Sequence, residues 1–240
     1  MLYRRILLKL SGEALAGERG FGIDEGILVS LAREVGVVRS AGVQTGIVIG
    51  GGNFIRGAAA AGPIDRVSAD SMGMIATIMN ALAFRAALVR EGTPCSVMSA
   101  LPIAGVVRPV DAVEAVRSLE DGCVVVFAGG TGNPFLSTDT CAALRALEIG
   151  ADVLVKATKV DGIYDRDPVR DTDAVFLAEL DYDEVLAGRL AVMDATAVSL
   201  CRDNNLELRV INIFGHGALA RLVAGEPIGS VVGGRRENRG

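Results

Sequence analysis

Short apolar runs that end in glycine or small polar residues alternate with longer helical patterns along this chain of 240 residues. The runs have the length of strands, and the middle ones lack a polar face, which is typical of strands buried on both sides. The strand-like runs are residues 3–10, 45–52, 95–98, 123–130, 152–157 and 207–212. The helical patterns are residues 24–41, 65–91, 112–120, 139–150, 183–204 and 216–224. This alternation predicts an α/β fold, a three-layer αβα sandwich with a largely parallel central sheet.

Two segments between these runs carry further expectations. In the second helical pattern, apolar side chains follow helical spacing and are predicted to face the core. They are Met72, Ile75, Ile78, Met79, Leu82 and Ala86. The acidic stretch 161–173 contains Pro168 and is predicted to be a loop or hairpin between two lobes.

Composition restricts the class of protein. Half of the residues are hydrophobic and the mean hydropathy is +0.42, which indicates a packed globular chain. The net charge of -5 argues against nucleic acid as the main partner. No uninterrupted apolar run approaches the roughly 20 residues of a membrane span, and no secretory signal pattern is seen, so a cytoplasmic protein without a membrane partner is expected. The cysteines are widely spaced, which favours reduced thiols over a zinc site or disulfides. They are Cys95, Cys123, Cys141 and Cys201.

Lysine is rare in this chain. Among 24 basic side chains only Lys9, Lys156 and Lys159 are lysines, and each lies at or just past an apolar run. A lysine carries a compact, mobile point charge of the kind used at a transferring phosphate. Chance placement is the alternative interpretation.

Three of the predicted strands end in glycine or small polar residues. The segments are "LKLSGEAL" at 8–15, "IGGGNFIRG" at 49–57 and "GGTGN" at 129–133. Glycine lets backbone N–H groups approach phosphate oxygens, and a helix that begins there adds its positive dipole end. Neither a P-loop nor the dinucleotide-binding glycine fingerprint occurs. The sequence therefore predicts an anion site of another kind at one edge of the sheet.

Six segments carry a family resemblance. They are "KLSGEAL" at 9–15, "IGGGNFIRG" at 49–57, "DSMGMIATIMNALA" at 70–83, "GTGNPFLSTD" at 130–139, "KATKVDGIYDRDP" at 156–168 and "VMDATA" at 192–197. In this order they closely resemble the bacterial uridylate kinases of the amino-acid-kinase superfamily. The resemblance runs from about Tyr3 to Val232. Ser71 and Leu136-Ser137 depart from the family's usual residues, which bears on details of the acceptor pocket.

The resemblance implies an ATP-dependent kinase of pyrimidine nucleotide synthesis that converts UMP to UDP by direct in-line transfer of the γ-phosphoryl group. It implies one amino-acid-kinase domain over residues 1–240, with an acceptor lobe at 1–150 and an ATP lobe at 151–240. Magnesium is expected to arrive with ATP, held mainly by phosphates, with no protein metal ligands. A homohexamer with GTP and UTP as effectors is also implied.

The same resemblance assigns site residues. The catalytic pair is Lys9 and Asp139. The ATP-binding residues are Lys9, Leu10, Ser11, Gly12, Gly52, Arg56, Thr158, Tyr164 and Asp167. The UMP-binding residues are Gly51, Arg56, Asp70, Thr131, Gly132, Asn133, Pro134, Phe135, Leu136, Ser137 and Thr138. The candidate GTP segment is Gly17, Glu18, Arg19, Gly20, Phe21 and Gly22.

Three aspartates have structural interpretations beside the functional ones. Asp139 is expected to cap the helix that follows it and also to orient Lys9 and Lys156. Asp70 is expected to hold the ribose hydroxyls, with an N-cap of the helix around Met72 as the alternative. For Asp194, capping is favoured over catalysis. The histidine, His216, lies in a turn and is expected to be a surface or capping residue rather than a catalytic base. No activated Ser, Cys or His nucleophile is evident in the sequence.

Two other functions compete with a UMP kinase. One is a kinase of the same superfamily that phosphorylates a carboxylate or carbamate, which absence of the 130–139 signature would favour. The other is a non-catalytic nucleotide- or oxyanion-binding oligomer, which replacement of Lys9 or Asp139 would favour. The 130–139 signature is present in this chain, and so are Lys9 and Asp139, so the sequence favours neither alternative.

Overall fold

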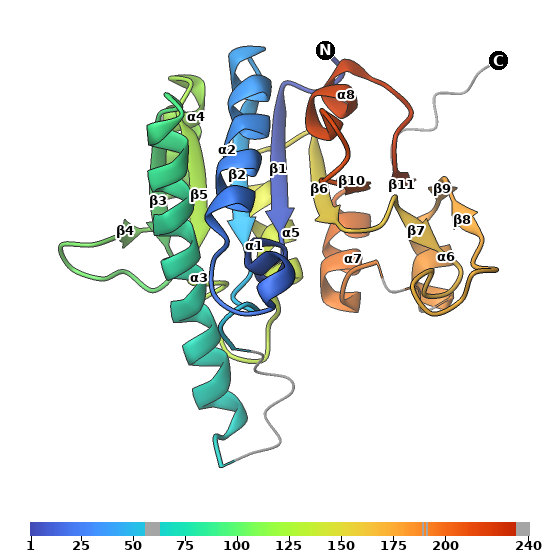
Figure 1. Ribbon diagram of the computed structural model, residues 1–240, viewed down its shortest axis with the longest axis horizontal. Coiled ribbons are helices and arrows are strands. Elements are labelled where there is room, and N and C mark those ends of the chain that lie inside the picture. Colours follow the sequence, from blue (N-terminus) through green and yellow to red (C-terminus); the bar gives the residue numbers. More distant parts are fainter. Residues whose placement is uncertain (56–62, 189, 191, 234–240) are drawn as a thin grey trace.

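A largely parallel sheet organises the fold of the computed structural model, which describes residues 1–55, 63–188, 190 and 192–233 (Figure 1). Its nine strands lie in the order β4-β3-β5-β2-β1-β6-β10-β11-β9, and only the β10–β11 pair is antiparallel. The strands are β1 Arg5–Leu10, β2 Gln44–Ile49, β3 Cys95–Ser99, β4 Arg108–Pro109, β5 Val124–Ala128, β6 Val153–Thr158, β9 Glu179–Leu180, β10 Glu207–Asn212 and β11 Ser230–Val232. A separate antiparallel hairpin joins β7 Ile163–Tyr164 to β8 Phe176–Leu177.

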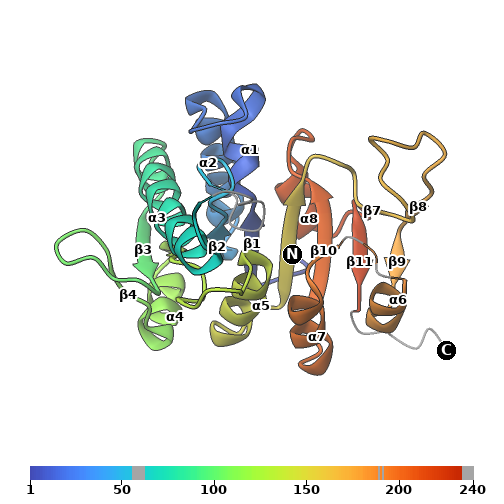
Figure 2. The same cartoon turned by 90° about the horizontal axis from the view of Figure 1, so that it is seen from below.

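Helices cover both faces of the sheet, as a view along its lower edge shows (Figure 2). They are α1 Gly12–Ala16, α2 Glu25–Ser40, α3 Arg66–Arg90, α4 Ala112–Glu120, α5 Thr138–Glu148, α6 Tyr182–Ala187, α7 Ala195–Asp203 and α8 Ala218–Ala224, with a short 3-10 turn, η1 Gly17–Arg19. Side chains of α2, α3 and α8 pack on one face, and those of α4, α5, α6 and α7 pack on the other. The predicted three-layer sandwich is confirmed.

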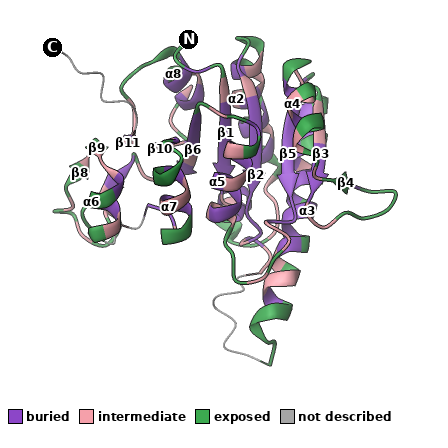
Figure 3. Cartoon of the chain, turned by 180° about the vertical axis from the view of Figure 1, so that it is seen from behind, coloured by how far each residue is buried: buried purple, intermediate pink, exposed green. Residues whose placement is uncertain are grey.

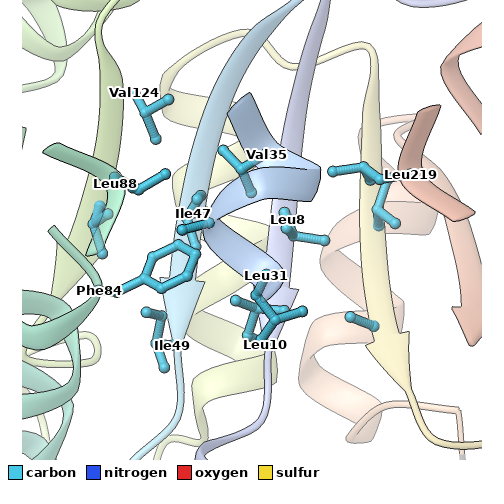
Figure 4. Close-up of a cluster of buried hydrophobic side chains, with 14 of the residues drawn as sticks. Leu8, Leu10, Leu31, Val35, Ile47, Ile49, Phe84, Leu88, Val124 and Leu219 are labelled. Atoms are coloured by element: carbon cyan, nitrogen blue, oxygen red, sulfur yellow. The ribbon is translucent and has the colours of Figure 1, made fainter. Parts of the chain in front are cut away.

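The central strands are buried on both faces, as their lack of a polar side predicts. In β1, Leu8 belongs to the cluster beneath α2 and α3, whereas its neighbour Leu7 belongs to the opposite cluster. In the first of these clusters, Phe84 of α3 packs near Ile47 of β2, and Leu31 of α2 packs near Leu10 of β1 (Figure 4). Each fully buried side chain of this size contributes roughly 1.5–3 kcal/mol to folding. The two clusters fix the sheet between its helices.

Parallel register brings the glycine-containing turns to one edge of the sheet. The strands β5, β2, β1 and β6 are consecutive and parallel, and the arrowheads of β1, β2 and β6 point to the same lower edge in Figure 1. The turns that follow β1, β2 and β5 therefore lie side by side. Open parallel sheets bind ligands at this carboxyl edge.

The predicted helix 183–204 is wrong in its continuity, because the structure has two helices there. The first, α6, ends at Ala187 with Gly188 as its C-cap, and α7 begins after its N-cap Asp194. The side chain of Asp194 accepts a hydrogen bond from the Ala197 amide at 3.0 Å, so a strong N-cap starts a new helix there.

The 161–173 stretch is the predicted hairpin, since the Asp165 amide donates to the Val175 carbonyl at 3.1 Å where β7 and β8 diverge.

The prediction of which α3 residues face the core is also wrong for most of the six residues. Of the six apolar residues assigned to it, Ile78 is buried, whereas Met72, Ile75 and Met79 are 45%, 50% and 49% exposed. The residues facing the sheet are Met74, Thr77, Ile78, Ala81, Phe84 and Leu88. Nearly every side of α3 is apolar, so spacing alone does not identify the packed face. The helix also extends past the sheet, where its surface is mostly exposed (Figures 1 and 3).

Length and composition alone would allow α3 to cross a membrane, and among the described residues it is the one helix for which this holds. Core helices of soluble proteins pass the same test. Here 44% of its most apolar window is buried inside the protein, against the sheet and α2.

Candidate active site

Two lysines from adjacent strands meet one carboxylate at the carboxyl edge of the sheet. Lys9 of β1 and Lys156 of β6 are register partners, so their side chains leave the same face. The Nζ atom of Lys9 lies 2.7 Å from Oδ1 of Asp139, and the Nζ atom of Lys156 lies 3.2 Å from Oδ2. Lys156 also donates to the carbonyl of Val192. The sheet register thus places two positive charges against a single negative one.

Burial and these charges together set the ionisation of the cluster. Burial favours the neutral acid of Asp139, but the ammonium groups of Lys9 and Lys156 outweigh it and hold the pKa of the carboxyl below its usual range. Burial lowers the pKa of Lys156, as does the nearby charge of Lys9, while Asp139 offsets part of that effect. With all three groups ionised, the cluster carries a net charge of about +1, which suits an anionic ligand.

The helix α5 is capped by Ser137, which corrects the expectation that Asp139 caps it. The Ser137 hydroxyl accepts hydrogen bonds from the Asp139 and Thr140 amides at 2.9 and 3.2 Å. Asp139 lies in the first turn, so its carboxylate projects to the lysines instead. Its expected orientation toward Lys9 and Lys156 agrees with these distances. Because Asp139 is near the positive end of α5, the helix dipole favours its charged form.

Asp194 joins the first turns of two helices. Besides capping α7, its carboxylate accepts hydrogen bonds from the hydroxyls of Ser137 and Thr140, the latter at 2.9 Å. The capping expected of Asp194 is confirmed, and its link to α5 is an additional finding. The start of α5, which carries Asp139, is thereby tied to the start of α7.

The turns after β1 and β2 pack so closely that glycine is required. A Cβ atom on Gly12 would lie 2.5 Å from Oδ1 of Asn53 and 2.6 Å from the Gly50 carbonyl oxygen. On Gly51 it would lie 2.5 Å from the carbonyl oxygen of Gly73 in α3. Side chains at these positions would push the segments apart. Ser11, just before Gly12, caps α1 by accepting from the Ala14 amide at 3.1 Å.

A cavity of about 210 Å³ lies between these turns and α3. Ten of its lining residues are Gly51, Gly52, Ile55, Asp70, Gly73, Met74, Asn133, Leu136, Ser137 and Thr138. Asp70 lies inside α3 and does not cap it, because the N-cap is Asp65, whose side chain accepts from the Ser68 amide at 3.0 Å. The Asp70 carboxylate instead accepts from Arg66 Nε at 2.7 Å and from the Phe135 amide at 2.8 Å.

A second cavity, of about 410 Å³, lies beside β6 and the β7–β8 hairpin. It brings together the predicted residues Thr158, Tyr164 and Asp167, with Lys156 at its wall. The Tyr164 ring packs edge-on against Phe176, with ring centroids 5.5 Å apart. Ser137 and Thr138 line the first cavity, and Lys156 lines the second. The Lys9–Asp139–Lys156 cluster therefore lies between two hollows.

A family model decides what kind of chain has this site. Residues 4–212 match the model described as "Amino acid kinase family". The chain belongs to the amino acid kinase family. Within it, the chain is 56% identical over 232 residues to the uridylate kinase of Methylococcus capsulatus, covering 96% of this chain and 97% of that relative. It is 51% identical over 236 residues to the uridylate kinase of Legionella pneumophila strain Corby, covering 98% and 96%.

Solved structures of this family have the same fold. The UMP kinase of Bacillus anthracis superposes with a TM-score of 0.92 at 36% identity, covering 97% of each chain. The UMP kinase of Ureaplasma parvum superposes with a TM-score of 0.90 at 34% identity, covering 98% of this chain and 100% of that one. The predicted resemblance to uridylate kinases is confirmed.

Some residues that the family resemblance assigns lie away from the two cavities. Thr131 is one of them, and its hydroxyl accepts a hydrogen bond at 3.2 Å from the amide of Asn133, a residue that does line the smaller cavity. Phe135 is 66% exposed, and Arg66 lies over its ring at 5.4 Å. The candidate GTP segment, 17–22, comprises η1 and the turn after it, and it lines neither cavity. The predicted binding residue Arg56 lies outside the described residues.

Three polar residues that contact the glycine turns escaped the sequence reasoning. They are Asn53, Thr77 and Asn80, each buried. The available signal was a polar residue within an apolar helical segment, at Thr77 and Asn80.

A larger cavity, of about 730 Å³, was also not expected from the sequence. It lies between the end of α3 and the β3–β4 region, and its lining includes Arg85, Cys95 and Arg108.

Proposed function

We propose that this amino-acid-kinase family member is a UMP kinase, which transfers the γ-phosphoryl group of ATP to UMP and so serves pyrimidine nucleotide synthesis. The observation that carries the proposal is the Lys9–Asp139–Lys156 cluster between two cavities, in a chain 56% identical to a uridylate kinase. Phosphoryl transfer requires positioning and charge neutralisation more than covalent chemistry. The UMP phosphate oxygen is itself the nucleophile, so no side chain has to be activated.

In the proposed reaction, Lys9 and Lys156 neutralise charge on the transferring phosphoryl group. Asp139 holds both ammonium groups in place, and its charge offsets part of the effect by which burial lowers the pKa of Lys156. The backbone N–H groups of Ser11-Gly12 and Gly51-Gly52 face the phosphates. The acceptor oxygen attacks phosphorus in line with the leaving ADP oxygen, so one P–O bond forms as the other breaks and no proton has to move at the attacking atom.

Magnesium is proposed to arrive with ATP, held mainly by phosphate oxygens, where it neutralises their charge. The Asp139 carboxylate at the centre is already paired with two ammonium groups. This arrangement fits a metal held by the nucleotide rather than by protein carboxylates.

The smaller cavity is proposed to take UMP, within an acceptor lobe at 1–150. Asp70 is suited to the ribose hydroxyls, in exchange for its present partners Arg66 and the Phe135 amide. The rest of the proposed UMP site comprises Gly51, Arg56 and the segment Thr131–Thr138. The larger cavity beside β6 is proposed to take ATP within a lobe at 151–240. There Tyr164 is suited to pack against adenine, Thr158 lines the wall, and Asp167 is suited to accept from the ribose.

ADP release with a panel of acceptors tests the proposal. UMP should be used far better than CMP, because the cytosine amine presents a donor where uracil presents the O4 acceptor, and a mismatched base leaves buried groups unpaired. The nucleotide dUMP should be poorer than UMP if Asp70 holds the ribose hydroxyls. Turnover of acetylglutamate, aspartate or carbamate would replace the proposal with a superfamily kinase of another acceptor. Nucleotide binding without ADP release would indicate a non-catalytic protein.

Self-association into a homohexamer is part of the proposal, as are a cytoplasmic location and GTP and UTP effectors. The support for self-association is the exposed apolar side of α3, where Val67, Met72, Ile75 and Met79 are each 45–50% exposed. The candidate GTP segment remains 17–22, in which Arg19 and Phe21 are exposed. Loss of a GTP response in Arg19→Ala, with unchanged basal turnover, tests that assignment.

A further inference from the structure

Two polar side chains interrupt the packed face of α3. Thr77 and Asn80 are 2% and 0% exposed, among apolar neighbours such as Ile78 and Ala81. They are three residues apart, which places them on one side of the helix, about one turn from each other. A polar group in such a position costs free energy unless it is hydrogen-bonded, so its partners indicate why it is there.

Asn80 holds the turn that follows β2. Its amide nitrogen donates to the Gly50 carbonyl and to Oδ1 of Asn53, both at 2.7 Å. Its oxygen accepts from Nδ2 of Asn53 at 2.9 Å, and that nitrogen also donates to the Gly22 carbonyl at 2.8 Å. Both N–H bonds of each amide are therefore used, and Asn53 is 1% exposed. The turn Gly50–Asn53 is bound to α3 at both of its ends.

Thr77 holds the turn that follows β5. Its hydroxyl donates to the Met74 carbonyl in its own helix at 2.7 Å and accepts from the Gly129 amide at 2.7 Å. Gly129 has a φ of +75°, a backbone conformation that favours glycine, and it is the first residue after the strand. Thr77 is thus the acceptor for the buried N–H group at the point where the chain leaves the sheet.

The two turns come from neighbouring strands. Residues Gly46–Val48 of β2 pair in parallel with Val125–Phe127 of β5, so the strands lie about 4.8 Å apart. The small cavity lies between the turns and α3, with Gly51 and Gly130 on its wall together with Thr77. One rigid helix therefore contacts both sides of the hollow that lies next to the lysine cluster.

We propose that Thr77 and Asn80 are positioning residues: from one face of α3, Asn80 fixes the Gly50–Asn53 turn and Thr77 fixes the Gly129 turn, which sets the spacing between them. The inference rests on the proposed function, in which the first turn faces phosphates and the second leads into the segment around the nucleoside. Spacing matters because a displacement of about 1 Å can lower the rate of a positioned reaction about 100-fold.

The test compares Asn80→Ala and Thr77→Val with Thr45→Val. Thr45 is a matched control, since its hydroxyl is buried (1% exposed) and bonded to the Val43 carbonyl, at the opposite end of β2. Asn80→Ala should lower kcat about 10- to 100-fold with a smaller change in KM for UMP. Thr77→Val should raise KM for UMP about tenfold, and Thr77→Ser, which keeps the hydroxyl, should restore it. Thr45→Val should lower only the melting temperature.

Asn80→Ser is measured beside Asn80→Ala. The serine variant leaves a smaller cavity than the alanine variant but cannot make all three hydrogen bonds of the amide. If Asn80→Ala does not fold, the comparison is made with Asn80→Ser alone. Unchanged kcat and KM in folded Asn80 and Thr77 variants would overturn the proposal, as would equal kinetic losses in Thr45→Val. The unmodified enzyme tests the proposed function separately. If it releases no ADP with UMP, that function fails, and positioning is then judged by calorimetric affinity for UMP and ATP, which the Asn80 and Thr77 variants should weaken and Thr45→Val should not.

Discussion

Lys9 and Lys156 occupy paired positions on two adjacent parallel strands, and both ammonium groups meet the carboxylate of Asp139. One carboxylate cannot neutralise two ammonium groups, so a positive charge remains at the carboxyl edge of the sheet. The Nζ atom of Lys9 lies 2.7 Å from Oδ1 of Asp139, and that oxygen is buried.

Replacing Lys9 should stop most of the reaction without unfolding the chain. Lys9→Met keeps the length and the apolar stem of the side chain, while Lys156 still pairs with Asp139. Removal of one donor to developing charge should lower kcat about 10²- to 10³-fold. Steady-state ADP release measures this, and a thermal melt of the same preparation checks the fold. A kcat close to that of the unmodified enzyme would remove Lys9 from the mechanism.

Asp139→Asn should lower both turnover and stability. Ser137 caps α5, so the cap is retained, but Lys9 and Lys156 lose their counter-charge. Breaking a buried ion pair costs about 3 kcal/mol. Chemical denaturation at neutral pH measures the loss. Ser137→Ala is the control that removes the cap and keeps the charge, and it should cost about 1 kcal/mol.

The stability lost in Asp139→Asn should depend on pH with a definite sign. Burial lowers the pKa of Lys156 while Asp139 raises it, so the variant lowers that pKa further. The unfolded chain then binds the lysine proton more tightly than the folded one, and stability rises with pH between the two pKa values. The deficit should shrink from about pH 7 to about pH 10. Asp139 itself, whose pKa is lowered, is fully ionised over this range. A deficit that stays constant would show that lysine repulsion is not its cause.

Asp194 should contribute to stability by joining two helices. Asp194→Ala removes the cap of α7 and the acceptor shared by Ser137 and Thr140. The expected cost is about 2 kcal/mol, against about 1 kcal/mol for Asp181→Ala, which removes only the cap of α6. Asp194→Asn should retain most of the stability, because an amide oxygen still accepts from the Ala197 amide. Equal costs for the two alanine variants would contradict the joining role.

Local sequence determined the strands and most helices because each long element has its own signal. All six predicted strands are present near their predicted positions. The short strands β4, β9 and β11 were missed, since segments of two or three residues have too little periodicity to register. The apolar face of α3 was misassigned for a different reason, because Met72, Ile75 and Met79 are apolar and yet exposed.

The residues of the candidate site could be predicted where they belong to a recognisable sequence motif. Lys9 and Asp139 lie in such motifs, and the structure brings them to 2.7 Å. Contacts between segments distant in sequence were not predictable in this way. Asn80 reaches Gly50 across 30 residues, and Asp194 reaches Thr140 across 54. Only the folded sheet brings these pairs together.

The exposed apolar side of α3 should be an interface between copies of the chain. Ile75→Asp places a carboxylate at a position that is 50% exposed now, and burying that charge on association is costly. The unmodified chain should migrate well above its monomer mass of 24.9 kDa, and Ile75→Asp should shift it toward the monomer. Val37→Asp is the matched control, since Val37 is an apolar residue of α2 that is 57% exposed and lies beside Glu91–Thr93, just past the C-terminal end of α3. Light scattering coupled to size exclusion measures both. An Ile75→Asp variant that keeps the mass of the unmodified protein would show that this side of α3 is not the interface.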